Sequence, residues 1–270
     1  GDVYKRQDYA RARARAEAAL PLGQALGGQR LILVVQRAAS ILWVMGDLAA
    51  AEGLATEALT ASRAGGDLVG ELSALYMLGN IFTDRRELER AVATFEMVLK
   101  LSRRANHLSH EAKSLVNLGN IAYLRGDYAA ARHYGQSARG RFQELGQQRS
   151  IVVSLGNLSQ TDLKLGDTAA ARRGAREALA LARSLGAQPW VLWAVFLCGQ
   201  ILAETGDVSR ALALYGLARA HPAVDNQVRV EIDEEVARLA VPAAEVEAGL
   251  AAGAGLDLEA VVGEILGGQW

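Results

Sequence analysis

Four copies of the dipeptide Gly-Asp along this chain are separated by multiples of one interval, 40 residues. They stand at Gly46-Asp47, Gly126-Asp127, Gly166-Asp167 and Gly206-Asp207, and Arg86-Glu87 occupies the place of the missing copy. Sequences that repeat at a fixed period of roughly 20–50 residues fold as arrays of one supersecondary unit, because each unit needs its neighbours to bury its apolar face. The spacing therefore predicts five units in register.

Small residues keep the same period on either side of this dipeptide. Apolar residues recur at helical spacing, so we expect two helices of about 17 residues in each unit. The glycine then ends the first helix and the aspartate caps the second. Since helices approach closely only where side chains are short, the packing positions are predicted to be Gly79, Gly119 and Gly199 on first helices and Ala51, Ala91, Ala131, Ala171 and Ala211 on second helices.

The pattern resembles the tetratricopeptide repeat, most closely at Leu118–Tyr128 (LGNIAYLRGDY) followed by Ala131 and Ala138. The resemblance covers about residues 8–220. It implies an all-α fold, a right-handed α-α superhelix of about five helical hairpins, and a role in protein–protein interaction. The sequence departs from the family in its longer unit and in the absent proline. The usual aromatic residue survives only as Phe95 and Tyr215.

The two ends of the chain leave the repeat. Residues 1–7 (GDVYKRQ) have no counterpart in any unit and resemble a non-native junction, whereas Asp8–Gly27 is predicted to be a leading half-repeat. We expect a helical cap over residues 221–270. It contains an amphipathic helix at Asp225–Ala240, a second helix with Pro242 in its first turn, and a short helix at Leu258–Leu266 capped by Asp257.

The end of the chain also resembles the C-terminus of large bacterial regulators. The segments that carry this likeness are Ala211–Ala218, Val246–Leu250 and Leu256–Val262. The families include LuxR-type ATPases and antibiotic-regulatory-protein-type regulators, in which a nucleotide-binding module and an effector domain precede the repeats. The resemblance implies that this chain is the C-terminal sensor arm of such a protein. A stand-alone adaptor and, more remotely, a helical-repeat enzyme remain alternatives.

The motifs of several catalytic classes are missing from the sequence. No G-x-x-x-x-G-K-S/T phosphate loop and no G-x-S-x-G nucleophile elbow is present. Cys198, the single cysteine, is predicted to be a buried structural thiol. His107 and His110 share a helical face that suits a metal, but we expect them in a polar loop between repeats. We therefore predict neither catalytic residues nor a cofactor.

Charge and hydropathy limit the partners. A net charge of −1 gives no electrostatic reason for nucleic-acid binding. No apolar run reaches the roughly 18 residues of a membrane helix, and the first residues lack the apolar core of a secretion signal. The chain is therefore expected to be cytoplasmic, and its expected partner is a protein or peptide, with upstream domains of the same parent chain as one candidate.

One polar column along the first helices is the predicted partner-binding surface. It runs through Ser40, Asn80, Asn120, Gln160 and Gln200, at 40-residue spacing. Amides can bind an extended peptide backbone, but they can equally hold neighbouring helices together. Flanking residues assigned to the same concave face are Tyr76, Lys113, Asn117, Tyr123, Asn157 and Trp193. Asn80 and Asn117 match two positions of the carboxylate clamp known in the family, but the required cations are missing, so we expect no such clamp.

Overall fold

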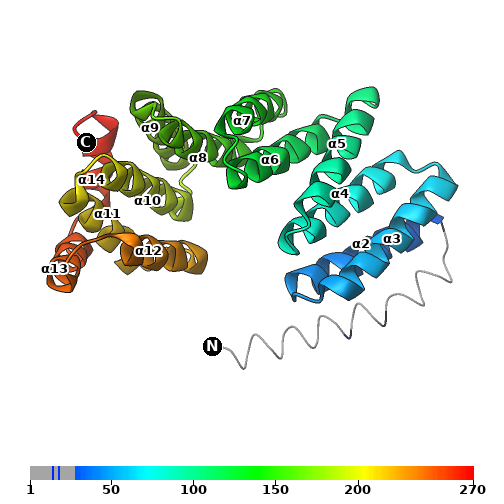
Figure 1. Cartoon of the computed structure of the whole chain (residues 1–270), viewed down its shortest axis with the longest axis horizontal. Coiled ribbons are helices and arrows are strands. Elements are labelled where there is room, and N and C mark those ends of the chain that lie inside the picture. The colour runs from blue at the N-terminus through cyan, green and yellow to red at the C-terminus, as the bar shows by residue number, and fades with distance from the viewer. Residues whose placement is uncertain (1–13, 15–17, 19–27) are drawn as a thin grey trace. The chain divides into compact units, whose positions relative to one another are not determined.

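The computed structural model describes residues 28–270, together with residues 14 and 18. The predicted leader at residues 1–7 and, apart from those two residues, the predicted half-repeat at Asp8–Gly27 lie outside that description. The described residues form helices and turns without a strand (Figure 1). The helices are α2 (Gly28–Val44), α3 (Leu48–Gly65), α4 (Leu68–Asp84), α5 (Leu88–Arg104), α6 (Leu108–Leu124), α7 (Tyr128–Glu144), α8 (Gln148–Lys164), α9 (Thr168–Ser184), α10 (Gln188–Glu204), α11 (Val208–Ala220), α12 (Asn226–Arg238), α13 (Ala243–Ala254) and α14 (Leu258–Leu266).

This architecture confirms the predicted all-α helical-repeat fold. Helices of 17 residues alternate with short turns, as the period required. Contacts divide the chain into two compact units, Gly1–Ile121 and Ala122–Trp270, with the division inside α6. In the first unit α2 packs on α3 and α4 on α5, and in the second α8 packs on α9 and α10 on α11.

The turns follow a period half as long as the one read from Gly-Asp. One residue with positive φ ends every helix from α2 to α10, at 20-residue spacing: Gly46, Gly66, Arg86, Asn106, Gly126, Gly146, Gly166, Gly186 and Gly206. The backbone N–H of the residue after each positive-φ residue donates to the carbonyl of the residue five positions before it, for example Asp47 N to Leu42 O at 2.9 Å. This bond is the mark of the Schellman motif, which satisfies the free carbonyls of a helix end.

Aspartate capping of the second helices is confirmed. Asp47, Asp127, Asp167 and Asp207 each accept a hydrogen bond from the backbone N–H three residues on. Glu87, at the irregular copy, makes no such bond, because its longer side chain instead reaches Arg90. An N-cap needs a short acceptor side chain.

The small residues at the predicted packing positions are buried where the structure shows their neighbours. The alanines that follow the turns are buried (Ala51, Ala91, Ala131, Ala171 and Ala211). Gly79 and Gly199 each lie against an aromatic ring. A Cβ on Gly79 would lie 2.6 Å from the Phe95 ring, and one on Gly199 would lie 2.5 Å from the Tyr215 ring. Each glycine therefore makes room for a ring.

The C-terminal helices pack into the second unit. Backbones meet directly between α11 and α13, since a Cβ on Gly216 would lie 2.2 Å from Leu250 O and one on Gly253 2.0 Å from Ala213 O. Val262 and Ile265 of α14 and Ile232 of α12 are buried in the same core as α10 and α11. Helix α14 has its predicted bounds and is capped by Asp257. Pro242 stands at the N-cap of α13, one position before the predicted first turn.

Candidate functional site

The ten residues predicted to bind a partner divide between the two units. Tyr76 and Asn80 on α4 and Lys113, Asn117 and Asn120 on α6 belong to the first. The second contains Tyr123 at the end of α6, Asn157 and Gln160 on α8, and Trp193 and Gln200 on α10. Each set is described within its own unit.

In the first unit the polar side chains contact one another. Asn117 Nδ2 on α6 donates to Asn80 Oδ1 on α4 at 3.0 Å. The Lys113 ammonium lies 5.9 Å from the centre of the Tyr76 ring, within reach of a cation–π attraction. The Asn80–Asn117 bond matches the second of the two predicted roles for these amides, in which they join neighbouring helices.

The two histidines lie at the start of α6 rather than both in a loop. His110 is buried in the first turn, and its Nδ1 lies 3.1 Å from His107 Nδ1 and its Nε2 3.3 Å from Ser73 Oγ. Burial, reinforced by the charges of His107 and Lys113, lowers the pKa of His110 to about 4. His107 Nδ1 accepts from the His110 backbone N–H, at 3.4 Å, because a helix start needs acceptors. Among the described residues no three histidine, cysteine or acidic side chains form a potential metal site.

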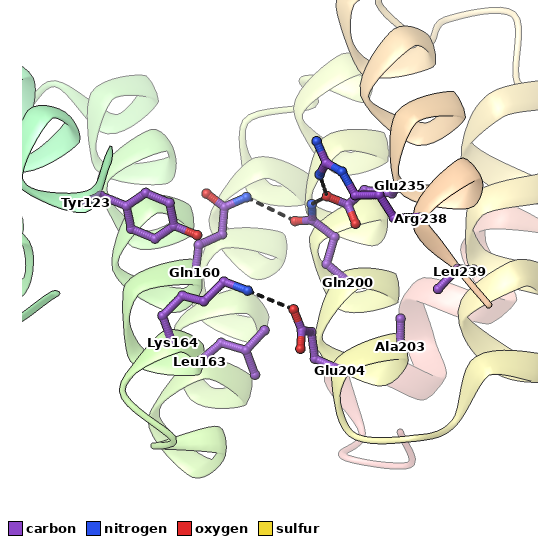
Figure 2. A pocket seen from close by; sticks show the side chains of 10 residues that line it. All are labelled: Tyr123, Gln160, Leu163, Lys164, Gln200, Ala203, Glu204, Glu235, Arg238 and Leu239. Atoms are coloured by element: carbon purple, nitrogen blue, oxygen red, sulfur yellow. Dashed lines mark hydrogen bonds and ion pairs between the residues drawn. The ribbon is translucent and has the colours of Figure 1, made fainter. Parts of the chain in front are cut away.

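The second unit contains an open pocket of about 380 Å³. Its lining comes from the C-terminal halves of α8 and α10 and the C-terminal end of α12, with Tyr123 at one side (Figure 2). The lining residues are Tyr123, Gln160, Leu163, Lys164, Gln200, Ala203, Glu204, Glu235, Arg238 and Leu239. A neighbouring pocket of about 300 Å³ shares Gln160, Gln200, Glu235 and Arg238 with it, and adds Asn157, Trp193, Glu231 and Glu234. We call the two pockets together the α8–α10–α12 groove.

A chain of hydrogen bonds crosses this groove. Gln160 Nε2 donates to Gln200 Oε1 at 3.0 Å, and Gln200 Nε2 donates to Glu235 Oε1 at 3.3 Å. Figure 2 shows the three side chains reaching toward one another from α8, α10 and α12. The repeat ladder therefore continues onto a helix outside the repeat.

Charged and aromatic side chains complete the lining. Lys164 Nζ donates to Glu204 Oε1 at 2.8 Å, and this bond raises the pKa of Lys164. Burial raises the pKa of Tyr123 above the usual value of a tyrosine. The Trp193 ring lies against Gly156, where a Cβ would come within 2.0 Å of it. Trp193 thus owes its position to a glycine on the facing helix.

Part of this groove was beyond the sequence prediction. Lys164 and Glu204 are 40 residues apart, so their opposite charges at one repeat position were a readable signal of contact. The α12 residues Glu231, Glu235 and Arg238 had no such signal, because α12 lies outside the period. The cap was expected to cover the last repeat, whereas α12 also forms one wall of the groove.

Other predicted features are placed as follows. Cys198 is buried, and burial raises the pKa of its thiol above the usual range, which disfavours the reactive thiolate. None of the helices within residues 28–270 combines the length and the apolar character that crossing a bilayer requires.

Comparison with known proteins agrees with this architecture. Residues 110–184 match the tetratricopeptide repeat family. Among solved structures, BtubC (BKLC) from P. vanneervenii is 20% identical, with a TM-score of 0.70 over 83% of this chain and 92% of that one. None of the curated proteins matches the chain. The described helices therefore have a fold of tetratricopeptide-repeat type.

Two further solved structures share this fold. A Rap protein complexed with Competence and Sporulation Factor is 16% identical, with a TM-score of 0.68 over 99% of this chain and 73% of that one. A signal transduction ATPase with a tetratricopeptide repeat sensor, from Pyrococcus horikoshii, is 17% identical, with a TM-score of 0.57. The match covers 84% of this chain and 37% of that one. At such identities the likeness shows a shared fold only.

Proposed function

We propose that this chain is a protein-interaction domain whose α8–α10–α12 groove binds an extended peptide segment of a partner. The observation that carries the proposal is the chain of hydrogen bonds from Gln160 through Gln200 to Glu235 across an open groove. Side-chain amides offer donors and acceptors together, which is what a peptide backbone requires. The proposal includes no catalytic step and no cofactor.

We propose further that this domain is a sensor and interaction arm of a larger cytoplasmic bacterial regulator, either a signalling or a transcriptional one. In support, one structure of the same fold is a signal transduction ATPase described as having a tetratricopeptide repeat sensor, and another is a Rap protein complexed with a factor. Binding of a partner or of upstream domains would then favour one arrangement of the repeats over another and so bias the attached switch.

The groove assignment is tested by titrating the isotope-labelled chain with three libraries of ten-residue peptides, one basic, one acidic and one uncharged. We expect shifts of the amide side-chain signals of Gln160 and Gln200 with at least one library. Gln200→Ala should weaken that binding about fivefold to tenfold, the value of one or two lost hydrogen bonds. The matched control is Gln143→Ala, an exposed glutamine of α7 outside the groove. Equal weakening by both variants, or shifts confined elsewhere, contradicts the proposal.

The regulatory part needs a different measurement. In a parent protein that carries a nucleotide-binding module, we expect the ATP hydrolysis rate to change when the segment equivalent to residues 28–270 is removed. An unchanged rate, with the groove still binding peptide, would leave a peptide-binding domain without this regulatory role.

A further inference from the structure

The α8–α10–α12 groove contains more negative than positive charge. Four carboxylates line it, from Glu204, Glu231, Glu234 and Glu235, against two cations, Lys164 and Arg238. A surplus of two negative charges in a concave surface produces a field that attracts cations.

The two cations are already engaged. Lys164 pairs with Glu204 at 2.8 Å, and Arg238 pairs with Glu235 at 2.8 Å and with Glu234 at 3.9 Å. Glu231 accepts a hydrogen bond from Gln227 at 3.1 Å, and no cationic group of the described residues forms an ion pair with it. The carboxylates of Glu231 and Glu234 therefore lack full compensation within the chain.

An aromatic ring stands beside these two carboxylates. Trp193 lines the same pocket of about 300 Å³ as Glu231 and Glu234. It is held by Gly156 and by an edge contact with Trp190, whose ring centre is 5.9 Å away. Tryptophan is the aromatic side chain that attracts cations best. A carboxylate pair next to an indole suits a guanidinium or an ammonium group.

A buried hydroxyl lies in the hydrophobic core of the same unit. Tyr215 on α11 is fully buried, its ring lies on Gly199, the residue before Gln200, and its hydroxyl has no hydrogen-bond partner among the described residues. Burial, and then the charges of Glu235 and Glu204, raise the pKa of this phenol. Buried polar groups normally have partners, so hydrogen bonding within the core of the second unit is incomplete at this hydroxyl.

We propose that the groove is specific for a cationic peptide segment, with a lysine or arginine side chain seated between Glu231 and Glu234 beside Trp193 and the peptide backbone along Gln160 and Gln200. This inference rests on the proposed function and adds the chemistry of the partner. It makes α12, a helix outside the repeat, the element that selects the ligand. Acidic peptides and nucleic acid are disfavoured by the same field.

The test uses four synthetic peptides of one Gly/Ser-rich backbone that carry two arginines, two lysines, two norleucines or two glutamates. Binding to the full chain is measured by fluorescence anisotropy at low and high salt. We expect the arginine and lysine peptides to bind at least tenfold more tightly than the other two, with an advantage that shrinks as salt rises. Glu231→Gln/Glu234→Gln should weaken the arginine peptide about threefold to tenfold.

The matched control is Glu245→Gln/Glu247→Gln, two exposed glutamates of α13 that make the same change in net charge away from the groove. Equal weakening by the two double variants would overturn the inference, since the attraction would then be nonspecific. Tight groove binding of the norleucine or glutamate peptide would overturn it while leaving the proposed function intact. If none of the four peptides shifts the signals of Gln160 or Gln200, and the three libraries also fail to, the proposed function fails with it.

Discussion

Equivalent first helices form two different surfaces in the two units. Between α4 and α6, Asn80 and Asn117 bond to each other and Lys113 lies over Tyr76. Between α8 and α10, Gln160 and Gln200 are also bonded, but the chain continues to Glu235 of α12. The period decides which positions are polar on first helices. The neighbouring non-repeat helix decides whether those positions line a walled groove.

The two surfaces also differ in how their charges are compensated. The first unit supplies its own cation to its own aromatic ring, whereas in the second unit an aromatic ring lies beside carboxylates that lack full compensation. One surface is satisfied internally and the other is short of positive charge. One copy of a repeat can therefore form a structural contact where another copy forms a candidate binding site.

Gly216→Ala is expected to have the largest effect and to loosen the second unit only. Gly216→Ala places a Cβ 2.2 Å from a backbone oxygen of α13, and backbone cannot move aside as a side chain can. We expect a loss of about 3 kcal/mol of unfolding free energy. Hydrogen exchange should rise in residues 122–270 and not in 28–121. Gly263→Ala, whose Cβ meets nothing within 4 Å, is the control, and a matching loss there would refute this packing.

Gly79 and Gly199, at equivalent repeat positions in the two units, each lie against an aromatic ring and allow a parallel test. Gly79→Ala and Gly199→Ala push a Cβ to 2.6 Å from Phe95 and 2.5 Å from Tyr215. Both should cost about 1–3 kcal/mol. Gly199→Ala should in addition disturb peptide binding, because Gln200 is adjacent. Thermal melts and urea titrations measure the first effect, and Gly53→Ala in α3, with open space around it, should instead be neutral or stabilising.

Acid should destabilise the first unit selectively. The pKa of His110 is lowered to about 4 in the folded chain, so between that pH and about 6.5 the unfolded chain binds more protons. Stability should therefore fall as pH drops through this window, by roughly 1–3 kcal/mol after allowance for solvent screening. The equivalent positions in the second unit, Ser150 and Trp190, do not titrate.

The pH effect is checked by urea unfolding at pH 7 and pH 4.5. His110→Gln should flatten the pH dependence of residues 28–121 in hydrogen exchange. His133→Gln, an exposed histidine of α7, should leave it unchanged. A wild-type slope that persists in His110→Gln would assign the effect to another group.

The amide pairs should differ in what they stabilise. A double-mutant cycle with Asn80→Ala and Asn117→Ala should show a coupling of about 0.5–1.5 kcal/mol in unfolding free energy. The cycle with Gln160→Ala and Gln200→Ala should show a smaller coupling in stability and a clear loss of peptide binding. Equal couplings in stability and no change in binding would mean that both pairs only hold helices together.

Much of the fold was predictable because it depends on local chemistry that repeats. A glycine with positive φ followed by a capping aspartate defines a helix boundary from two adjacent residues, as at Gly126-Asp127. The half-period was missed although Gly66-Asp67 repeats the signal 20 residues after Gly46-Asp47, because the other intermediate turns, at Asn106, Gly146 and Gly186, have no aspartate after the residue with positive φ. The glycine–ring contacts were not predicted, since the aromatic residue recurs in only two units.

Only the residues of the candidate site that lie on the repeat helices were predictable from the sequence. Gln160 and Gln200 follow the period, and so do Lys164 and Glu204, although the latter pair was not singled out. The acidic wall on α12 depends on how a non-repeating segment folds back onto α10 and α11, and no local pattern encodes that. The unpartnered hydroxyl of Tyr215 likewise exists only in the packed structure.

Arg86→Gly is expected to have the smallest effect, because it only makes one turn of the first unit resemble the glycine turns of the second. Arg86 has φ 63°, a conformation that costs a non-glycine residue about 1 kcal/mol or more. Arg86→Gly should therefore stabilise the chain by about 0.5–1 kcal/mol, since the freer unfolded chain offsets part of the gain. Asn106→Gly, at φ 51°, should gain less, because asparagine tolerates this region better than arginine. Urea midpoints rank the two variants, and a larger gain at Asn106 would mean that contacts of the Arg86 side chain, rather than its backbone, set the stability of this turn.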